Sequence, residues 1–369
     1  MSDIYELHQN VTYSDKQEHE LTEFRHARMN KSLLITKFER QLMSLVDTLI
    51  NTGYKEPMTK EQRKKYLFPT VRLPGLTLRF DVEPEFPVLK SRYVAVKAGL
   101  KEILWIYKDQ SNNTYDLKDD IWDKFVDENG SADASPGYQI KRPVSIYTDP
   151  VNRTGFKSYN NQAEYVLEYL RENKEGKFAV NTFWNPEELS RMPIIPPITT
   201  ALWNLDGGRL NLMLDERSAD LLFEVPIHVA QYAELMHLFA RDLGVKPGWF
   251  TYCLADGHIY DYEMKDCILQ QKYFKVLVSI CDNINTATNE FAEEIQKTAV
   301  DCADWHNKFT DKEDEWITGD EVLDLARKAL VVTPTFSVSG SSKFFEVKVE
   351  DCELKNYTDI GKIEFGRVY

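Results

Sequence analysis

The amino-acid sequence predicts a mixed α/β (α+β) domain in which helices surround one sheet. Four central segments have the apolar, β-branched and aromatic composition of strands: residues 178–184, 199–205, 209–215 and 248–254. A long helical pattern at residues 228–243 lies between the third and the fourth, with inward positions at Ala230, Leu235, Phe239 and Leu243. Strands and amphipathic helices in this mixed order pack as a sheet covered by helices.

The first half of the chain predicts three further helices. Residues 38–51 have apolar side chains at helical spacing, and Gly53 follows as a C-cap. Residues 95–107 predict a buried helix and residues 162–173 an amphipathic one. Between these helices we expect short strands and turns at residues 71–80 and 87–89, and a polar, turn-rich stretch at residues 148–161.

The two ends and an acidic stretch differ from this central part. Residues 1–37 are polar and charged, which predicts a solvated extension or a short helix. Residues 282–331 are acidic and helical, with a core-facing stripe predicted at Phe291, Ile295, Val300, Trp305 and Phe309. Residues 336–349 and 360–368 return to the alternation of strands.

Composition and charge exclude several classes of function. Apolar residues make up 43% of the 369 residues, which is enough for a substantial core. The formal charge of −14 argues against an extended nucleic acid or an anionic membrane as partner, and favours a small anion held by a local basic pocket. No apolar run is long enough to span a bilayer, and the first ten residues do not resemble a signal peptide, so we predict a cytoplasmic protein.

The five cysteines occur singly and form no CxxC pair: Cys253, Cys267, Cys281, Cys302 and Cys352. This spacing is typical of reduced core thiols, and it predicts neither disulfides nor a metal site. No cysteine precedes position 253, which matters for the reaction considered below.

A series of motifs follows in order along most of the chain. It comprises Phe86-Pro87, Lys101-Glu102-Ile103-Leu104-Trp105, Ile121-Trp122-Asp123-Lys124-Phe125, Phe183-Trp184-Asn185-Pro186, Glu216-Arg217-Ser218-Ala219-Asp220, Val225-Pro226-Ile227-His228, and Asp256-Gly257-His258-Ile259-Tyr260. In order and spacing these motifs resemble the thymidylate synthase family, including its dCMP and dUMP hydroxymethylase relatives, from about residue 38 to residue 369.

The resemblance implies a thymidylate-synthase-like mixed sheet that dimerises through the sheet to form a homodimer. It also implies a division of the chain into a polar extension (1–37), a core (38–275), an acidic helical insertion (276–333) and a C-terminal segment of the same core (334–369). The implied ligands are a small-molecule pyrimidine nucleotide and a tetrahydrofolate derivative, and the implied chemistry is that of a methyltransferase.

The nucleophile of the family is missing. Family members attack C6 of the pyrimidine with a cysteine thiolate in a Pro-Cys-His motif, whereas this chain reads Pro197-Ile198-Thr199. The family's Tyr-Gly-x-Gln motif reads Pro136-Gly137-Tyr138-Gln139, and its phosphate-binding Arg-Arg pair reads Lys177-Phe178. Lys65 and Arg72 are the remaining basic candidates near the family's glycine-rich phosphate loop. The chain therefore looks like a divergent member that lacks the catalytic cysteine.

Other site residues match the family by position. Arg217 and Ser218 match its phosphate ligands, and Asp220, His258 and Tyr260 match residues around the base and the sugar. Glu102 matches the general acid/base, Trp122 an aromatic on the cofactor side, and His228 the base-reading position, where the family has asparagine or aspartate. Trp203 stands where the family has a glutamine, and its indole is a candidate to fill part of the nucleotide pocket.

Each of these residues also has a structural interpretation. Arg217 with Ser218 could form a salt bridge at a sheet edge, Glu102 could lie on a solvated helix face, and His228 could be a packing histidine. His258 and Tyr260 could be hydrogen-bonded sheet residues. Cys253 could be imagined as a relocated nucleophile, but a buried core thiol is the alternative.

Two functional hypotheses follow. One is a divergent enzyme that acts on a nucleotide without the cysteine adduct. The other is a non-catalytic protein that keeps the fold and a nucleotide pocket but does not perform cysteine-dependent synthesis of dTMP. The lost nucleophile favours the second hypothesis, and the retained Glu102, Arg217, His258 and Tyr260 favour the first.

Overall fold

The computed structural model describes residues 35–55, 69–117, 121–149, 151–283, 289–308, 316–330 and 333–360. Nearly all of the predicted N-terminal extension, together with Lys65 and the strand-like pattern predicted beyond residue 360, therefore lies outside the described residues.

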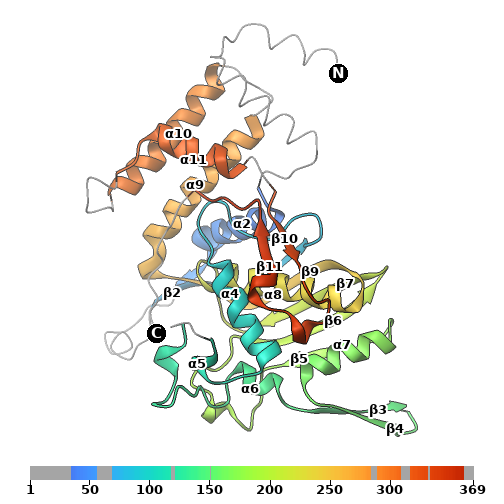
Figure 1. Ribbon diagram of the computed structural model, residues 1–369. Coiled ribbons are helices and arrows are strands. Elements are labelled where there is room, and N and C mark those ends of the chain that lie inside the picture. The colour runs from blue at the N-terminus through green and yellow to red at the C-terminus, as the bar shows by residue number, and fades with distance from the viewer. Residues whose placement is uncertain are drawn as a thin grey trace.

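The described part of the chain contains a seven-stranded mixed sheet, which confirms the predicted fold class (Figure 1). Its strands are β1 (Tyr54–Lys55), β2 (Thr70–Asp81), β5 (Val180–Thr182), β6 (Ile198–Asp206), β7 (Arg209–Glu216), β8 (Ala219–Asp220) and β9 (Lys246–Tyr260). The order is β1-β2-β9-β7-β6-β5, with β8 beside β9. Strands β7 and β8 run parallel to β9, whereas β2 pairs with β9, and β5 and β7 with β6, in antiparallel fashion.

Helices pack against this sheet and extend beyond it. They are α2 (Lys37–Thr52), α4 (Val96–Leu104), α5 (Thr114–Leu117), α6 (Pro136–Ile140), α7 (Gln162–Glu172), α8 (Glu224–Leu243), α9 (Met264–Asn283), α10 (Asn289–Lys308) and α11 (Gly319–Leu330). A π-helical turn, Trp105–Asp109, continues α4. The predicted C-cap of the first helix is correct, because the Gly53 N–H donates to the carbonyl of Leu49 at 2.8 Å.

The main core lies between α8 and one face of the sheet. Alternate residues of β7 and β9 are buried with α8 in one hydrophobic cluster: Leu210, Leu212, Leu214, Phe250, Tyr252 and Leu254. Helix α4 packs beside α8 (Figure 1). The opposite face of the sheet is open in the single chain, and it exposes 41% of Met213 and 37% of Trp249.

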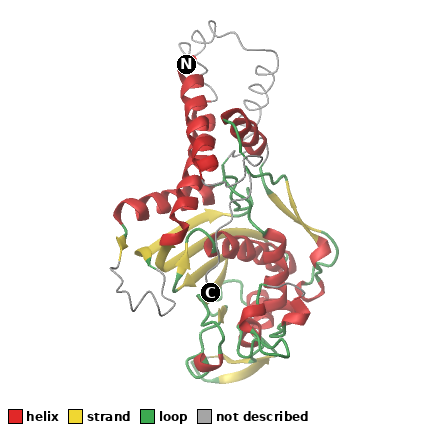
Figure 2. Cartoon of the chain, turned by 90° about the vertical axis from the view of Figure 1, so that its left-hand side faces the viewer, coloured by secondary structure: helices red, strands yellow, loops and turns green. Residues whose placement is uncertain are grey.

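A second hydrophobic cluster joins α9, α10 and α11, which lie at one end of the molecule and project beyond the sheet (Figures 1 and 2). Of the stripe predicted on α10, Ile295 packs against this cluster and Val300 does not, while the side chains of Phe291 and Phe309 lie outside the described residues. Val300 is 41% exposed, whereas Ala299, Cys302 and Ala303 are buried. Those three side chains face α9 and α11, and the sequence of one helix does not show where its neighbours lie. Ile35 and Ile360 belong to the same cluster.

Three predicted elements differ in the structure. The turn-rich stretch at residues 148–161 includes most of a hairpin, β3 (Val144–Asp149) with β4 (Thr154–Tyr159), and the side chains of β4 are largely exposed. Residues 87–89 are not a strand. Of the strand-like pattern at 336–349, only the start is a strand, β10 (Thr335–Val338), which pairs with β11 (Cys352–Lys355). The rest is loop and 3₁₀ turns at Phe344–Glu346 and Val349–Asp351.

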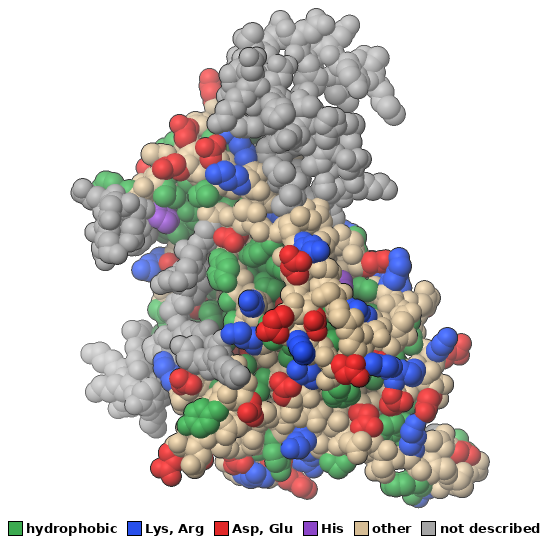
Figure 3. Space-filling view, viewed as in Figure 1, with side chains coloured by type: hydrophobic (Ala, Val, Ile, Leu, Met, Phe, Trp, Pro, Cys, Tyr) green, Lys and Arg blue, Asp and Glu red, His purple; other side chains and the backbone are tan. Residues whose placement is uncertain are grey.

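The surface charges are mixed. On the face shown in Figure 3, acidic and basic side chains are interspersed, and they do not gather into one basic surface of the kind that binds an extended nucleic acid. No helix among the described residues is long and apolar enough to cross a membrane.

Candidate functional site

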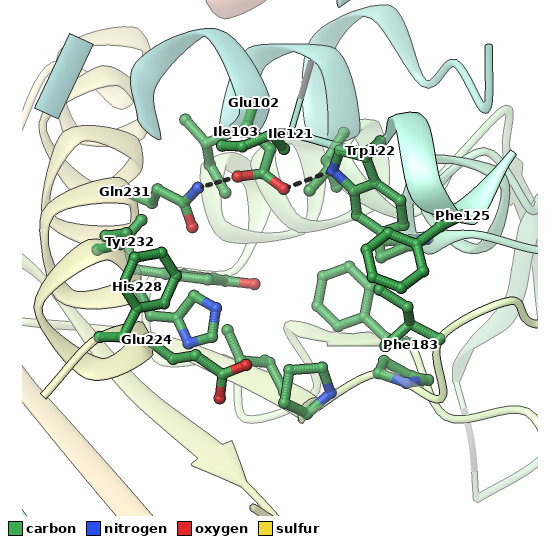
Figure 4. Close-up of a pocket in the computed structure, with 18 residues that line it drawn as sticks. Glu102, Ile103, Ile121, Trp122, Phe125, Phe183, Glu224, His228, Gln231 and Tyr232 are labelled. Carbon is green, nitrogen blue, oxygen red and sulfur yellow. Dashed lines mark hydrogen bonds between the residues drawn. The ribbon is translucent and has the colours of Figure 1, made fainter. Parts of the chain in front are cut away.

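A cavity of about 150 Å³ lies between α4, α8 and the start of β6 (Figure 4). Most of its walls are apolar or aromatic, and its polar side chains come mainly from two helices. It is lined by Glu102, Ile103, Ile106, Ile121, Trp122, Phe125, Pro136, Phe183, Ile194, Pro196, Pro197, Ile198, Phe223, Glu224, Ile227, His228, Gln231 and Tyr232. A concave, mostly apolar space with a few converging polar groups is the usual form of a small-molecule site.

Glu102 is held in a fixed position at one wall. One carboxyl oxygen accepts a hydrogen bond from Trp122 Nε1 and the other from Gln231 Nε2, both at 2.7 Å (Figure 4). The Trp122 ring lies against Trp105 and Phe125, with ring centroids 5.5 and 6.1 Å apart. The structure thus places the predicted acid/base residue and the predicted cofactor-side aromatic together at the cavity, and Glu102 does not lie on a solvated helix face.

His228 forms a buried ion pair behind the cavity surface. Its Nδ1 lies 3.2 Å from Glu216 Oε2 and 3.3 Å from the Tyr252 hydroxyl. Burial alone lowers the pKa of His228, but the charge and hydrogen bond of Glu216, with smaller contributions from Glu224 and Glu102, raise it to about 9. At neutral pH the ring is therefore an imidazolium. Its Nδ1–H donates to Glu216, and the residue also lines the cavity.

Glu224 was missed by the sequence interpretation. It lies one helical turn before His228, and its carboxyl group points into the cavity (Figure 4). Burial and then the charge of Glu216 raise its pKa to about 7. Residues 224, 228 and 231 have the i, i+4, i+7 spacing of one helix face, so helical spacing was the signal that could have placed Glu224 beside His228.

Ile198 occupies a wall of the cavity. It is the first residue of β6, it is 7% exposed, and a bulge follows it in the pairing with β7. No described cysteine lines the cavity. Cys253, the imagined relocated nucleophile, instead lies in a depression of the sheet with Asp215 and Thr77. Burial and the nearby charge of Asp215 raise the pKa of its thiol, which opposes thiolate formation.

Arg217 and Ser218 do not line the cavity. The guanidinium of Arg217 donates from Nε to the Pro196 carbonyl at 3.1 Å and from Nη2 to the Ile195 carbonyl at 2.6 Å. Its partners among the described residues are thus backbone oxygens of the loop that forms one cavity wall. The alternative of a salt bridge at a sheet edge does not describe this geometry.

Asp220, His258 and Tyr260 lie together beside the cavity but outside its lining. Asp220 pairs with His258 across β8 and β9, and the ring of His258 meets that of Tyr260 edge-on at 5.0 Å. Asp220 Oδ1 accepts the backbone N–H groups of Leu222 and Phe223, at 2.9 and 3.1 Å. Burial raises the pKa of this carboxyl group. These contacts fit the structural interpretation of the three residues, and their sugar-binding role stays a prediction.

Two further residues that were considered for the nucleotide site do not line the cavity. Trp203 is a core residue, because its indole N–H donates to Asn181 Oδ1 at 2.8 Å and its ring packs 5.1 Å from Phe239. Trp203 does not line the cavity described above. Phe178, where the family has an arginine, is 58% exposed and lies away from the cavity of its own chain.

The volume of the cavity limits what it can hold. An apolar cavity of about 150 Å³ takes up one benzene-sized ring, whereas drug-sized ligands fill about 300–1,000 Å³. One pyrimidine ring fits here, but a pyrimidine and a two-ring pterin together do not. No step considered below therefore involves a folate. Among the described residues, no group of three or more His, Cys, Asp or Glu side chains is placed to hold a metal ion.

Comparisons with known proteins agree with this fold. The sequence model of the family described as "Thymidylate synthase" matches residues 40–368. A thymidylate synthase from Clostridium beijerinckii is 29% identical over 236 residues, which cover 63% of this chain and 81% of the relative. Thymidylate synthase 1 of Bacillus subtilis is 28% identical over 246 residues, which cover 64% and 85%.

Among solved structures, thermostable thymidylate synthase A from Bacillus subtilis aligns with a TM-score of 0.65. The alignment covers 89% of this chain and 99% of that structure at 22% identity, so it supports the fold alone. Because the family model spans most of the sequence, including the described cavity, the chain belongs to the thymidylate synthase family.

Proposed function

We propose that this protein binds a pyrimidine nucleoside monophosphate, with the base in the cavity, and does not carry out cysteine-dependent synthesis of dTMP. The observation that carries the proposal is the wall formed by Ile198, which presents a saturated side chain where the family has its thiolate. A saturated carbon cannot add to C6 of a pyrimidine.

Residues beside the cavity are suited to contact the phosphate and the sugar of the nucleotide. Arg217 and Ser218 directly follow β7, and the Arg217 backbone N–H donates to the Pro197 carbonyl at 2.9 Å, beside the cavity wall. The guanidinium keeps further N–H donors for a phosphate after its two bonds to carbonyl oxygens. His258 and Tyr260 are the proposed sugar contacts. The open face of the sheet, with Met213 and Trp249, is the surface through which we expect two copies to pair.

A second candidate function is nucleotide-modifying catalysis by a different mechanism. The observation in its favour is the pair of carboxyl groups at the cavity, Glu102 held by two N–H donors and Glu224 with a pKa near 7. A carboxyl group with such a pKa can give and take a proton at neutral pH. This pair provides acid–base chemistry, but it does not provide the covalent adduct of the family.

Titration calorimetry of the full chain with dUMP, dCMP and dTMP tests the binding proposal. We expect saturable heat with at least one nucleotide, and weaker binding of the matching nucleoside, which lacks the phosphate. In Arg217→Ala this preference for the nucleotide should fall by about 10- to 100-fold, because a charge-assisted contact contributes about 1.5–3 kcal/mol.

Arg153→Ala, which removes an exposed arginine at the β3–β4 hairpin, is the matched control and should bind like the wild type. Absence of heat with all three nucleotides would overturn the proposal. An unchanged preference for nucleotide over nucleoside in Arg217→Ala would overturn the role of Arg217.

A further inference from the structure

We propose that Glu188, which does not line the cavity, is a positioning residue that fixes the size of the cavity and so restricts it to single-ring bases. This inference rests on the proposed function and deepens it, because it names the side chain that sets the size limit of the same site.

Glu188 accepts five side-chain hydrogen bonds. It lies on the connection between β5 and β6, residues 184–197, which we call the strap. Its Oε1 accepts the Tyr138 hydroxyl at 3.2 Å and Arg191 Nη1 at 2.9 Å, and its Oε2 accepts Gln139 Nε2 at 2.9 Å, Arg142 Nη1 at 2.9 Å and Asn185 Nδ2 at 2.7 Å. A carboxylate has about four acceptor positions, so these donors occupy all of its capacity. The hydrogen bonds, that of Gln139 above all, lower the pKa of Glu188, which is therefore ionised at neutral pH.

Two walls of the cavity meet at this carboxylate. The strap supplies Ile194, Pro196 and Pro197 to the lining, and α6 supplies Pro136. Three of the five donors to Glu188 come from α6 or from the turn that follows it. The carboxylate therefore ties the wall formed by the strap to the wall formed by α6.

Helix α6 is the fixed side of this tie. A Cβ added at Gly137 would lie 2.0 Å from the carbonyl oxygen of Ser111, so α6 rests directly against that backbone. The carbonyl oxygen of Gln139 accepts Gln162 Nε2 at 2.7 Å, which joins α6 to the start of α7. The position of α6 is thus set by contacts that do not involve the strap.

The strap depends mainly on polar contacts for its position. Among residues 184–197 only Met192 and Pro196 are buried, so little apolar area holds the segment in place. Arg217 holds its far end through the carbonyl oxygens next to β6, and Glu188 holds its middle. Loss of the Glu188 carboxylate should therefore let the middle of the strap move away from α6 and widen the cavity.

Titration calorimetry with dCMP, dUMP and dAMP tests the proposal. The cavity of about 150 Å³ has room for one ring, so the wild type should bind the better pyrimidine nucleotide at least about 10-fold more tightly than dAMP. In Glu188→Ala the affinity for that pyrimidine nucleotide should fall by about 10-fold, and its preference over dAMP should fall below about 3-fold. The preference falls because a wall that moves no longer excludes the second ring of a purine.

Two controls separate this role from a general loss of stability. Glu187→Ala removes an exposed carboxylate from the same strap and should keep the wild-type affinities. Arg171→Ala breaks an ion pair with Asp242, whose side chain is 3% exposed and which lies about 27 Å from Glu224 along α8. This variant should lose stability but keep the preference for the pyrimidine nucleotide. A loss of preference as large as that of Glu188→Ala would overturn the inference.

Arg191→Ala keeps the test decisive if Glu188→Ala does not fold. It removes one donor to Glu188 and the contact of Arg191 Nη2 with Asp133 Oδ1 at 2.5 Å, so the preference should fall in the same direction. In both variants the amide hydrogens of the strap should exchange faster than in the wild type, while those of α9 to α11 should not change.

Three results would overturn the inference and leave the proposed function intact. They are equal binding of dAMP and the pyrimidine nucleotides by the wild type, a wild-type preference in the folded variants, and unchanged hydrogen exchange of the strap in those variants. If the wild type binds no nucleotide, the proposed function fails and the role of Glu188 in nucleotide specificity fails with it.

Discussion

Replacing His228 with alanine is expected to lower the free energy of unfolding by about 3–5 kcal/mol. The side chain of Glu216 is fully buried, and one of its oxygens has no hydrogen-bond partner in the structure. The imidazolium of His228, 3.2 Å from the other oxygen, is its cationic partner. Without the imidazole, a carboxylate is left buried and uncompensated. Denaturant unfolding of the wild type and of His228→Ala measures the difference.

The double variant Glu216→Gln with His228→Ala provides the control. An amide carries no charge, so the double variant should recover much of the stability that His228→Ala loses. Equal stability of His228→Ala and the wild type would show that the pair does not matter for folding. A double variant less stable than His228→Ala would show that the unpaired charge of Glu216 is not what lowers the stability of His228→Ala.

The ion pair of His228 and Glu216 also predicts how the stability of the protein depends on pH. The pKa of His228 is about 9 in the folded protein, above the ordinary value of 6.5. Its contribution to stability is therefore fully present below about pH 6.5 and is lost as the pH rises through about 9. The stability difference between the wild type and His228→Ala should shrink over this window, and a constant difference would contradict the assignment of the charge to His228.

Replacing Glu234 with leucine is expected to raise the free energy of unfolding by about 1–3 kcal/mol. Glu234 lies on α8 with 0% exposure, and neither of its carboxyl oxygens has a hydrogen-bond partner in the structure. Burial raises its pKa well above the ordinary value, so burying this carboxyl group costs folding free energy above the ordinary pKa. Leucine has a similar size and needs no hydrogen bond.

Glu234→Gln is the matched control. Its amide group also lacks hydrogen-bond partners, so this variant should not gain comparable stability. The pH dependence has a definite sign. A carboxyl group whose folded pKa is raised contributes stability below about pH 4.5, and this contribution is lost as the pH rises. The advantage of Glu234→Leu should therefore grow from about pH 4.5 towards neutral pH. A leucine variant less stable than the wild type at neutral pH would contradict the account.

The sequence predicted the elements whose formation depends on local chemistry. The helix that ends at Gly53 was predicted correctly, because its apolar spacing and its cap both lie in a short segment. On α10, Ile295 packs inward as predicted, but Val300 does not, because Ala299 and Cys302 are the positions that neighbouring helices from other parts of the chain bury. The β3–β4 hairpin was missed because the side chains of β4 are largely exposed and the connecting residues are polar and turn-rich.

The candidate site was predictable to a similar extent. The motifs found Glu102, Trp122, Ile198 and His228, and all four line one cavity. They did not reveal Glu224, because a glutamate at the start of a helix is most often a solvated residue. That its carboxyl group points inward depends on how α8 packs against α4 and β7, which is a property of the tertiary structure.

The most direct test of the central claim is the release of tritium from C5-labelled dUMP and dCMP in the presence of methylenetetrahydrofolate. Covalent addition at C6 is what makes C5 reactive in the family, and Ile198 cannot perform it. The full chain should release tritium at the background rate, and Ile198→Ala should not change that rate. Release well above background by the wild-type chain would contradict the account and favour catalysis by a different nucleophile.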